Sequence, residues 1–413
     1  MPHEDGVMMR LGPCRKMYRA ETQRAVPLEE TLKRAEQMLP AAGVTRVADI
    51  TQLDRVGIPV YSCIRPTAEM GAISVYNGKG ATKLAAKVSA MMEGIERYSA
   101  ELKGRKLFVQ SFSKMGKEGD AINPASLILP QGRHPDLPVP WVEGFDICTG
   151  EPVFVPAHAV FHPVPRDLPP LFRTNTNGLA SGNTYEEAVF HALTEVIERD
   201  AWSIVEATRQ TGRSIEIPEN GMIGDLARRF GEAGIDIRLK DITSDIGIPT
   251  VAAVADDLVL RDPALLTIGM GTHTEAAIAA IRALTEVAQS RLTQIHGARE
   301  DTTTAEFRKQ LGYERTKRMN RHWFADNGSM DLGALPTFSS EDFLDDIHYM
   351  VKQLAGKGLH RVIAVDLTRP EIGIPVVRVV VPGLEVYAID SERIGDRCRD
   401  ARRRHISGPK PSR

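Results

Sequence analysis

Cysteine is scarce in this sequence, with four residues in a chain of 413. They lie far apart, at Cys14, Cys63, Cys148 and Cys398, and form no CxxC pair. This spacing argues against a zinc ribbon and against a disulfide framework. We expect reduced, partly buried thiols. Cys63 stays a candidate for handling sulfur, because the strand-like run 58–61 precedes it.

Long apolar runs and an excess of one charge are also absent. No stretch of about 18 apolar residues could span a bilayer, and the charged start, 1–24, lacks the apolar segment of a secretory signal. The net charge of −2 gives no general attraction to nucleic acid or to an anionic membrane. We therefore expect a cytoplasmic protein that binds neither of them.

The common nucleotide-binding and hydrolase motifs are missing as well. The chain has no GxxxxGK[ST] P-loop, no HRD or DFG pair of protein kinases and no HExxH. Any nucleotide site must therefore be of an uncommon kind.

Two sets of internal repeats are present instead. The segments 49–60, 241–250 and 366–376 each contain Asp-Ile-Thr or Asp-Leu-Thr followed by Gly-Ile-Pro, which predicts three equivalent β-hairpins. Helical segments over about 82–102, 185–207 and 274–295 share Ala, a large apolar residue, Met or Thr, Glu, two spacers, then Glu or Gln. We predict an α+β fold of three related hairpin and helix units, with mixed β-sheets covered by helices.

The rest of the chain is arranged around these repeats. We expect an N-terminal extension over 1–45, one large domain over 46–395 and a basic tail over 396–413 that is mobile. A Pro- and Gly-rich insertion of short strands occupies about 106–170.

Acidic side chains recur on the repeated helices. Residues three and four apart share a helix face, which puts Ser89, Glu93 and Glu96 on one stripe of the first helix. The second helix is apolar nearly all round, yet an acidic line runs down it: Glu187, His191, Glu195 and Glu198. His191 either contacts a site on this line or is a hydrogen-bonded core histidine.

A solvated stripe of Glu–Arg pairs is the simplest alternative, and each pair is worth a few tenths of a kcal/mol. A solvated stripe could account for the first helix taken by itself. It cannot account for a buried second helix, because unpaired buried carboxylates cost several kcal/mol each. If the units pack around one centre, five carboxylates converge there: Glu93, Glu96, Glu195, Glu198 and Glu286.

Converging carboxylates need cations, and oxygen ligands favour Mg²⁺ or a similar hard ion, which usually brings phosphates with it. Arg97, Arg199 and Arg291 closely follow the acidic positions and could bind phosphate oxygens or balance the carboxylates. Turns before the first two helices, which carry Lys79 and Asn183, could meet a phosphate at a helix N-terminus. These residues predict a site for Mg²⁺ and a nucleotide.

The motifs resemble those of the YcaO family, whose nucleotide site is built from SxxxExxER, a second segment ending in ExxER, and ExxQxR. The chain reads Ser89-x3-Glu93-x2-Glu96-Arg97, then Asn183-x3-Glu187 with Glu195-x2-Glu198-Arg199, then Glu286-x2-Gln289-x-Arg291. The resemblance extends over about 57–385 and includes the late Pro-Gly-Leu-Glu at 382–385.

This resemblance implies a YcaO-like catalytic domain over 46–395 that uses ATP and Mg²⁺. It implies catalytic roles for Glu93, Glu195, Glu286 and Arg291. It implies Mg²⁺ binding by Glu93, Glu96, Glu195, Glu198 and Glu286. It implies nucleotide binding by Lys79, Ser89, Glu96, Arg97, Asn183, Glu187, Arg199 and Gln289.

The resemblance also implies the reaction. A nucleophile adds to the carbon of a peptide amide, the oxyanion takes the γ-phosphoryl group of ATP, and phosphate leaves. A Cys, Ser or Thr side chain of the substrate gives an azoline, whereas external sulfide gives a thioamide.

Several absences favour the thioamide. Residues 409–413 depart from the PxPxP tail of many azoline-forming members, the region before the first hairpin is short for a leader-peptide domain, and there is no helical-repeat extension. Such a compact chain resembles the archaeal enzymes that install thioglycine in the alpha subunit of methyl-coenzyme M reductase. We therefore expect that subunit as the substrate and a sulfide donor as the source of sulfur. The resemblance to these enzymes also implies a TfuA-type partner and a homodimer.

Two other functions stay open. An azoline-forming cyclodehydratase of a peptide natural-product pathway would need Cys or Ser beside the target amide, and no added sulfide. A non-catalytic scaffold that binds Mg²⁺ and nucleotide would bind ATP without releasing phosphate when peptide is added.

Overall fold

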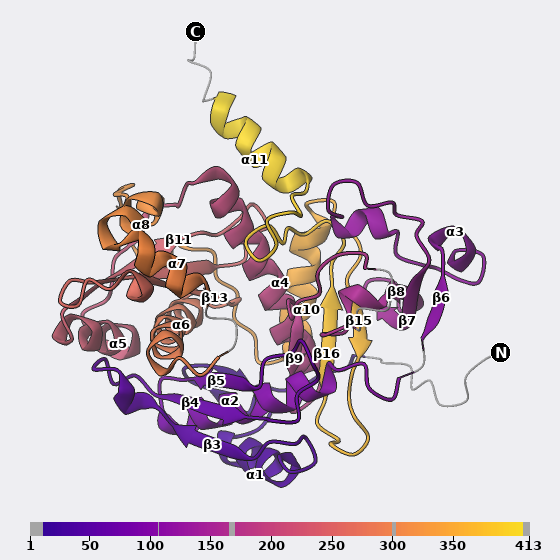
Figure 1. Ribbon diagram of the computed structural model, residues 1–413, viewed down its shortest axis with the longest axis horizontal. Coiled ribbons are helices and arrows are strands. Elements are labelled where there is room, and N and C mark those ends of the chain that lie inside the picture. Colours follow the sequence, from indigo (N-terminus) through magenta and orange to yellow (C-terminus); the bar gives the residue numbers. More distant parts are fainter. Residues whose placement is uncertain (1–10, 106, 165–169, 300–302, 408–413) are drawn as a thin grey trace.

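The computed structural model describes residues 11–105, 107–164, 170–299 and 303–407. The three predicted hairpins are all present as antiparallel strand pairs (Figure 1). They are β3 (Arg46–Asp49) with β4 (Val60–Ile64), β11 (Ile235–Asp241) with β12 (Thr250–Asp257), and β15 (Ile363–Asp366) with β16 (Val376–Val380).

The same side-chain hydrogen bonds build each hairpin turn. The repeated Asp accepts the N–H of the Thr two residues later, at 2.9, 2.9 and 2.8 Å for Asp49, Asp241 and Asp366. The hydroxyl of that Thr accepts the N–H of the first residue of the returning strand, at 3.2, 3.1 and 3.2 Å. Each repeated Gly has a φ between 67° and 78°, which a residue with a Cβ rarely adopts. The repeats in the sequence are therefore repeats of one turn.

Each hairpin gains a third strand that leads into one of the predicted helices. In the first unit β5 (Val75–Lys79) pairs with β4 and leads into α2 (Lys83–Ser99). In the second, β13 (Thr267–Thr272) pairs with β12 and leads into α6 (Ala276–His296). In the third, β9 (Leu179–Ser181) pairs with β16 and leads into α4 (Tyr185–Thr208), although both precede the hairpin in the chain. The predicted α+β class with three related units is confirmed.

Small residues bring the helices directly onto these strands. A Cβ added to Gly78 would clash with the backbone nitrogen of Ala90, and one on Gly271 would lie 2.7 Å from the backbone nitrogen of Ala283. The Ala in the repeated helix pattern and the Gly in the strand thus form one contact. This contact fixes how far along each strand the glutamates of the helix lie.

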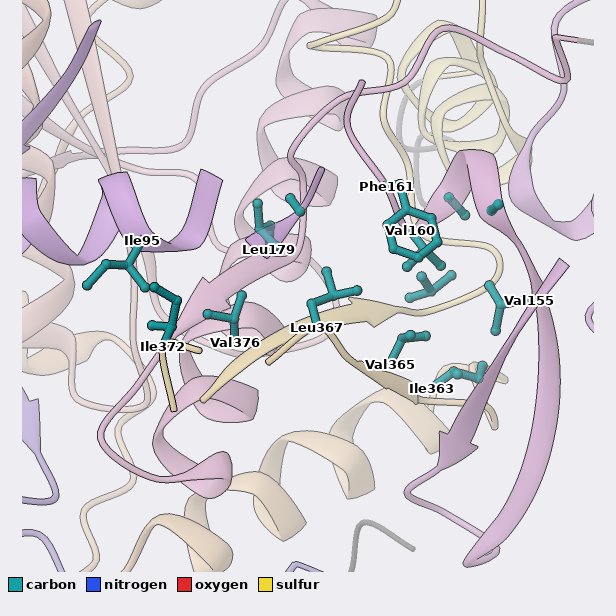
Figure 2. Close-up of a cluster of buried hydrophobic side chains, with 14 of the residues drawn as sticks. Ile95, Val155, Val160, Phe161, Leu179, Ile363, Val365, Leu367, Ile372 and Val376 are labelled. Atoms are coloured by element: carbon teal, nitrogen blue, oxygen red, sulfur yellow. The ribbon is translucent and has the colours of Figure 1, made fainter. Parts of the chain in front are cut away.

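The predicted insertion extends the third sheet. Its strands β6 (Phe108–Gln110), β7 (Val139–Asp146) and β8 (Glu151–Pro156) join the sheet through β7, which pairs with β15. Helix α3 (Phe112–Met115) lies between β6 and β7. Figure 2 shows the buried apolar cluster that joins them, where Val155 lies with Val365 of β15 and Ile95 of α2 packs near Val376. The insertion is therefore part of the core.

The remaining elements cover the sheets. The second sheet continues through β10 (Ser214–Ile215) to β14 (Ser329–Met330), which are parallel. Helix α5 (Gly221–Glu232) packs on α6, and α10 (Phe343–Ala355) packs on α4. Three helices follow α6 in the chain: α7 (Thr303–Leu311), α8 (Tyr313–Met319) and α9 (Arg321–Phe324).

The two ends of the described chain pack against α4. The N-terminal segment forms β1 (Tyr18–Arg19), β2 (Gln23–Arg24) and α1 (Leu28–Met38). The predicted tail begins as helix α11 (Asp396–Ser407), where Arg397 pairs with the buried Asp200 of α4 at 2.8 Å. The last part of that tail, 408–413, lies outside the described residues. Among the helices that the structure describes, none has the length and apolarity to cross a membrane.

Candidate active site

A cavity of about 690 Å³ is lined by one face of each repeated helix, α2, α4 and α6. Its acidic lining residues are Glu93, Glu96, Glu187, Glu195, Glu198, Glu206 and Glu286. Its basic lining residues are Arg24, Lys79, Arg97, Arg199, Arg282, Arg299 and Arg308. The five carboxylates expected to converge therefore share one cavity, with cationic side chains around them.

Helix caps and ion pairs within each helix position the glutamates of α2 and α4. The hydroxyls of Thr82 and Thr184 cap the starts of α2 and α4 by accepting backbone N–H groups at 3.1 and 3.2 Å. One turn apart on the same face, Arg97 pairs with Glu93 at 3.1 Å and Arg199 pairs with Glu195 at 3.6 Å. The arginines thus lie beside the carboxylates and line the cavity with them.

Glu96 is a carboxyl group whose charge is strongly disfavoured here. Burial raises its pKa to about 8, and repulsion from Glu93 and Glu195 adds to the shift, while Arg97 opposes it. One of its oxygens accepts the N–H of Ser181 at 3.0 Å. A cation in the cavity would favour the ionised form.

Glu198 and Glu286 form a second interacting pair. Burial raises the pKa of Glu198 to about 7, with added repulsion from Glu286. Burial also opposes ionisation of Glu286, but Lys79 and Arg199 together hold the pKa of that carboxyl below its ordinary value. Oε2 of Glu198 is buried and has no hydrogen-bond partner among the described residues. This oxygen is available to a ligand.

Strand β5 supplies two further contacts to α6. The ammonium group of Lys79 pairs with Glu286, and the side-chain amide of Gln289 donates to the carbonyl of Asn77. Glu286 also accepts the N–H of Met270 at 3.2 Å. These bonds place Lys79 in the wall of the cavity.

Glu187 is fixed from several sides. The amide of Asn183 donates to both of its oxygens, at 3.1 and 3.0 Å, and the N–H of Ala25 donates at 2.8 Å. Asn183 does not itself line this cavity, so the structure gives it the role of orienting Glu187. His191 lines the cavity and contacts Arg24, and burial first, then Arg24, hold its pKa well below the ordinary value.

Arg291 lies elsewhere, which corrects the prediction that it acts in catalysis. It is fully buried and binds Asp54 at 2.7 and 3.0 Å and Asp257 at 3.1 Å. Five residues separate it from Glu286, which corresponds to roughly 140° around a helix. Arg97 and Arg199 lie four residues from their glutamates and so remain on the same face. Arg291 therefore ties α6 to the first hairpin.

Some lining residues escaped the sequence analysis. Arg282 lies one turn before Glu286, so its position on that face could have been recognised. Arg24 reaches the cavity from β2 and lies 3.7 Å from Glu187, a contact between distant segments that no local pattern marks. Ser89, which the sequence placed on the same stripe as Glu93 and Glu96, also lines the cavity.

Comparison with known families decides what kind of site this is. The model of the YcaO family, described as a cyclodehydratase that binds ATP and Mg²⁺, matches residues 77–385, most of the chain. This chain belongs to the YcaO family. Family membership makes it an ATP-dependent enzyme that activates peptide amides, and it confirms the prediction of ATP and Mg²⁺ as cofactors.

Individual YcaO relatives match nearly end to end. The structure of YcaO from Methanopyrus kandleri bound with AMPPCP and Mg²⁺ is 35% identical in sequence and has a TM-score of 0.79. The match covers 93% of this chain and 98% of that chain. An uncharacterized protein of Methanothermobacter thermautotrophicus is 52% identical over 91% of this chain and 99% of its own. An uncharacterized protein in the tfuA 3′ region of Rhizobium leguminosarum bv. trifolii is 33% identical, over 88% and 89%.

The cavity of this YcaO chain fits Mg²⁺ carried by a nucleotide. No group of three or more His, Cys, Asp or Glu in the described residues could hold a metal ion by itself. Mg²⁺ usually takes only one or two carboxylates and completes its ligands with phosphates and water. The free oxygen of Glu198 and the raised pKa values of Glu96 and Glu198 suit such a cation, and the lining arginines suit the phosphates.

The cysteines stand apart from this YcaO site. All four lie in the described part of the chain, and none lines the cavity. Cys63 is buried, and burial raises the pKa of its thiol to about 12, with Glu93 adding repulsion. A thiol that stays protonated is a poor nucleophile, so Cys63 is unsuited to carry sulfur.

Proposed function

We propose that this enzyme replaces the oxygen of a peptide backbone amide with sulfur, using ATP and an external sulfide donor. The observation that carries the proposal is the cavity itself: it has the charges for Mg²⁺ and phosphates, but no cysteine among the described residues that line it. Sulfur must then come from outside the chain. One ATP is consumed, the amide oxygen leaves in phosphate, and sulfur takes its place.

The target we propose is a glycine in the alpha subunit of methyl-coenzyme M reductase. The resemblance of the compact chain to the archaeal thioglycine-forming enzymes supports this choice. The relative in the tfuA 3′ region supports a TfuA-type partner for sulfur delivery.

In this proposal the acidic residues of the cavity bind Mg²⁺ and the basic residues bind the phosphates. One or two of the cavity carboxylates, Glu93, Glu96, Glu195, Glu198 and Glu286, would hold Mg²⁺, with the phosphates of ATP and water completing its ligands. When bound, ATP supplies the phosphoryl group that turns the amide oxygen into a leaving group, and Mg²⁺ offsets its negative charge. Lys79, Arg97 and Arg199 would orient the phosphates through fixed cationic groups in the cavity wall.

Positioning and charge neutralisation are the catalytic means that this arrangement offers. The rigid pairings of Arg97 with Glu93 and Lys79 with Glu286 leave little reorganisation for the reaction itself. Asn183 and Ala25 keep Glu187 in one orientation at the edge of the cavity.

The proposal is tested by mass spectrometry of a glycine-containing peptide from the reductase after incubation with ATP, Mg²⁺ and sulfide. The expected product is heavier by the difference between sulfur and oxygen, with one phosphate released per peptide. Glu195→Gln should abolish the product, whereas Glu186→Gln, a change on the same helix outside the cavity lining, should not. Phosphate release with no mass change in the peptide would contradict thioamide formation.

Azoline formation is the second candidate, favoured by the family description as a cyclodehydratase. It predicts loss of one water from a peptide with Cys, Ser or Thr beside the target, and it needs no sulfide. The same assay with such a peptide, with and without sulfide, separates the two reactions.

A further inference from the structure

A second, smaller cavity adjoins the active site. It has a volume of about 60 Å³ and is lined by Arg378 of β16, Val196 of α4 and the segment before β9. The neighbours of these residues line the main cavity: Glu195 precedes Val196, and Leu179 is the register partner of Arg378. The two cavities therefore share α4 and the β9–β16 pair as walls.

Unsatisfied polar atoms gather in this small cavity. Arg378 is only 4% exposed, yet its Nε and Nη1 have no hydrogen-bond partner among the described residues. Its Nη2 makes one long bond, to Oδ1 of Asn175 at 3.4 Å. Oδ1 of Asn177 and Nδ1 of His158, in the same lining, also lack partners within that part of the chain. Buried polar groups without partners are rare, and a small bound species normally completes them.

The charge of the cavity selects an anion. Its lining contains two arginines and, among the residues that the structure describes, no carboxylate. Arg393 is already occupied: it donates to the carbonyls of Leu127 and Ile128 at 2.6 and 2.8 Å and lies 3.9 Å from the ring centroid of Phe172. Arg378 has no carboxylate within 4.0 Å in the described chain, and only the more distant Glu195 and Glu96 offset part of its buried charge.

Both arginines remain cationic at neutral pH. Burial lowers the pKa of Arg378 to about 10, partly offset by Glu195, and burial lowers that of Arg393 to about 10 as well. His158 is neutral, because burial lowers its pKa to about 4. The cavity thus presents a fixed positive charge and a neutral imidazole.

We propose that this cavity binds a small inorganic anion of the reaction, either hydrosulfide before it is consumed or phosphate after it forms. The identity of the anion rests on the proposed function. A volume of about 60 Å³ is far too small for a nucleotide but has room for a small inorganic anion. Water alone would add no negative charge to the partial compensation of Arg378 by Glu195 and Glu96.

The test is thermal unfolding of the full chain, without ATP or peptide, at constant ionic strength. Sodium gluconate, whose anion is too large for the cavity, is replaced stepwise by sodium hydrosulfide or sodium phosphate. The unfolding midpoint of the wild type should rise with the concentration of at least one of these anions, as for any ligand of the native state. Arg378→Met should abolish the rise, and Arg378→Lys should keep part of it.

Arg105→Gln is the matched control. Arg105 is also a partly buried arginine whose pKa burial lowers to about 10, but it lines neither cavity. This variant should keep the full anion-dependent rise.

Each outcome has one meaning. A rise with hydrosulfide supports a sulfur-binding pocket, and a rise with phosphate supports a product pocket. No rise over gluconate in the wild type, or an equal rise in Arg378→Met, overturns the proposal. If Arg378→Met does not fold, a wild-type crystal soaked in bromide decides, by the presence or absence of an anomalous peak beside Arg378. An enzyme that binds the anion but forms no thioamide would contradict the proposed function and leave this pocket intact.

Discussion

At the scale of single residues, two carboxyl groups of the cavity exchange protons near neutral pH. Glu96 and Glu198 have pKa values of about 8 and about 7, because burial and neighbouring glutamates disfavour their charge. A cation bound by either residue must first replace a proton. Binding of Mg²⁺ and ATP is therefore linked to pH.

The affinity for ATP in the presence of Mg²⁺ should rise as the pH increases from about 6 to about 8 and level off above the pKa of Glu96, since the ionised carboxylates are the ligands. Isothermal titration calorimetry at several pH values measures this dependence. A double change, Glu96→Gln with Glu198→Gln, should both weaken binding and flatten the profile. An unchanged wild-type affinity across this range would contradict the role of both residues.

The raised pKa of Glu96 makes the stability of the free protein fall with increasing pH, whereas the affinity for ATP should rise. A carboxyl group whose pKa is raised from 4.5 to about 8 on folding contributes stability below about pH 4.5, and that stability is lost as the pH rises through 8. Without nucleotide, Glu96→Gln should therefore unfold at a temperature higher by roughly 1–3 °C at pH 8.5, and at the wild-type temperature near pH 4. Scanning calorimetry of both proteins gives the comparison, with Glu186→Gln expected to match the wild type. A variant less stable than the wild type at pH 8.5 would show that the charge of Glu96 is not disfavoured.

At the scale of elements, the arginines of α4 and α6 have different roles. Arg291 binds two buried aspartates on the far side of the helix, whereas Glu286 and Gln289 face β5 and the cavity. Arg199 of α4 lines the cavity and is paired less tightly, at 3.6 Å from Glu195. One arginine therefore stabilises the fold, and the other is placed for the ligand.

Arg291→Gln should destabilise the chain by about 3–5 kcal/mol, because it leaves Asp54 and Asp257 buried with less compensation. Its affinity for ATP should change less than twofold in conditions where it is folded. Arg199→Gln should show the reverse, with nearly normal stability and at least tenfold weaker ATP binding. Urea unfolding and calorimetric titration of both variants measure the contrast, and a reversal would restore Arg291 to the site.

Local patterns made the elements predictable from the sequence. The hairpins followed from Asp, Thr and Gly because those residues form the turn through short-range hydrogen bonds. The acidic helix faces followed from spacing alone. The motif ExxQxR, however, places its arginine one residue further than ExxER does, and this difference moves Arg291 to another face. Arg24 could not be predicted, since only packing of the N-terminal segment on α4 brings it to Glu187.

At the scale of the whole molecule, three units that share one turn each contribute one helix to one cavity. The order of the chain hides this arrangement, because the strand and helix of the third unit come before its hairpin. The insertion and helix α11 attach to this third unit, through β15 and through Asp200 of α4. A site built from three units requires the complete domain, which we propose to extend over 46–395, together with the N-terminal segment that carries Arg24 into the cavity.

The central claim is that the amide oxygen of the peptide accepts the phosphoryl group of ATP. The most direct test uses a peptide whose target carbonyl carries oxygen-18, incubated with the enzyme, ATP, Mg²⁺ and sulfide. The account predicts that the released phosphate contains the label, in the same amount as thioamide formed. Unlabelled phosphate together with thioamide, or phosphate released without the peptide, would contradict it.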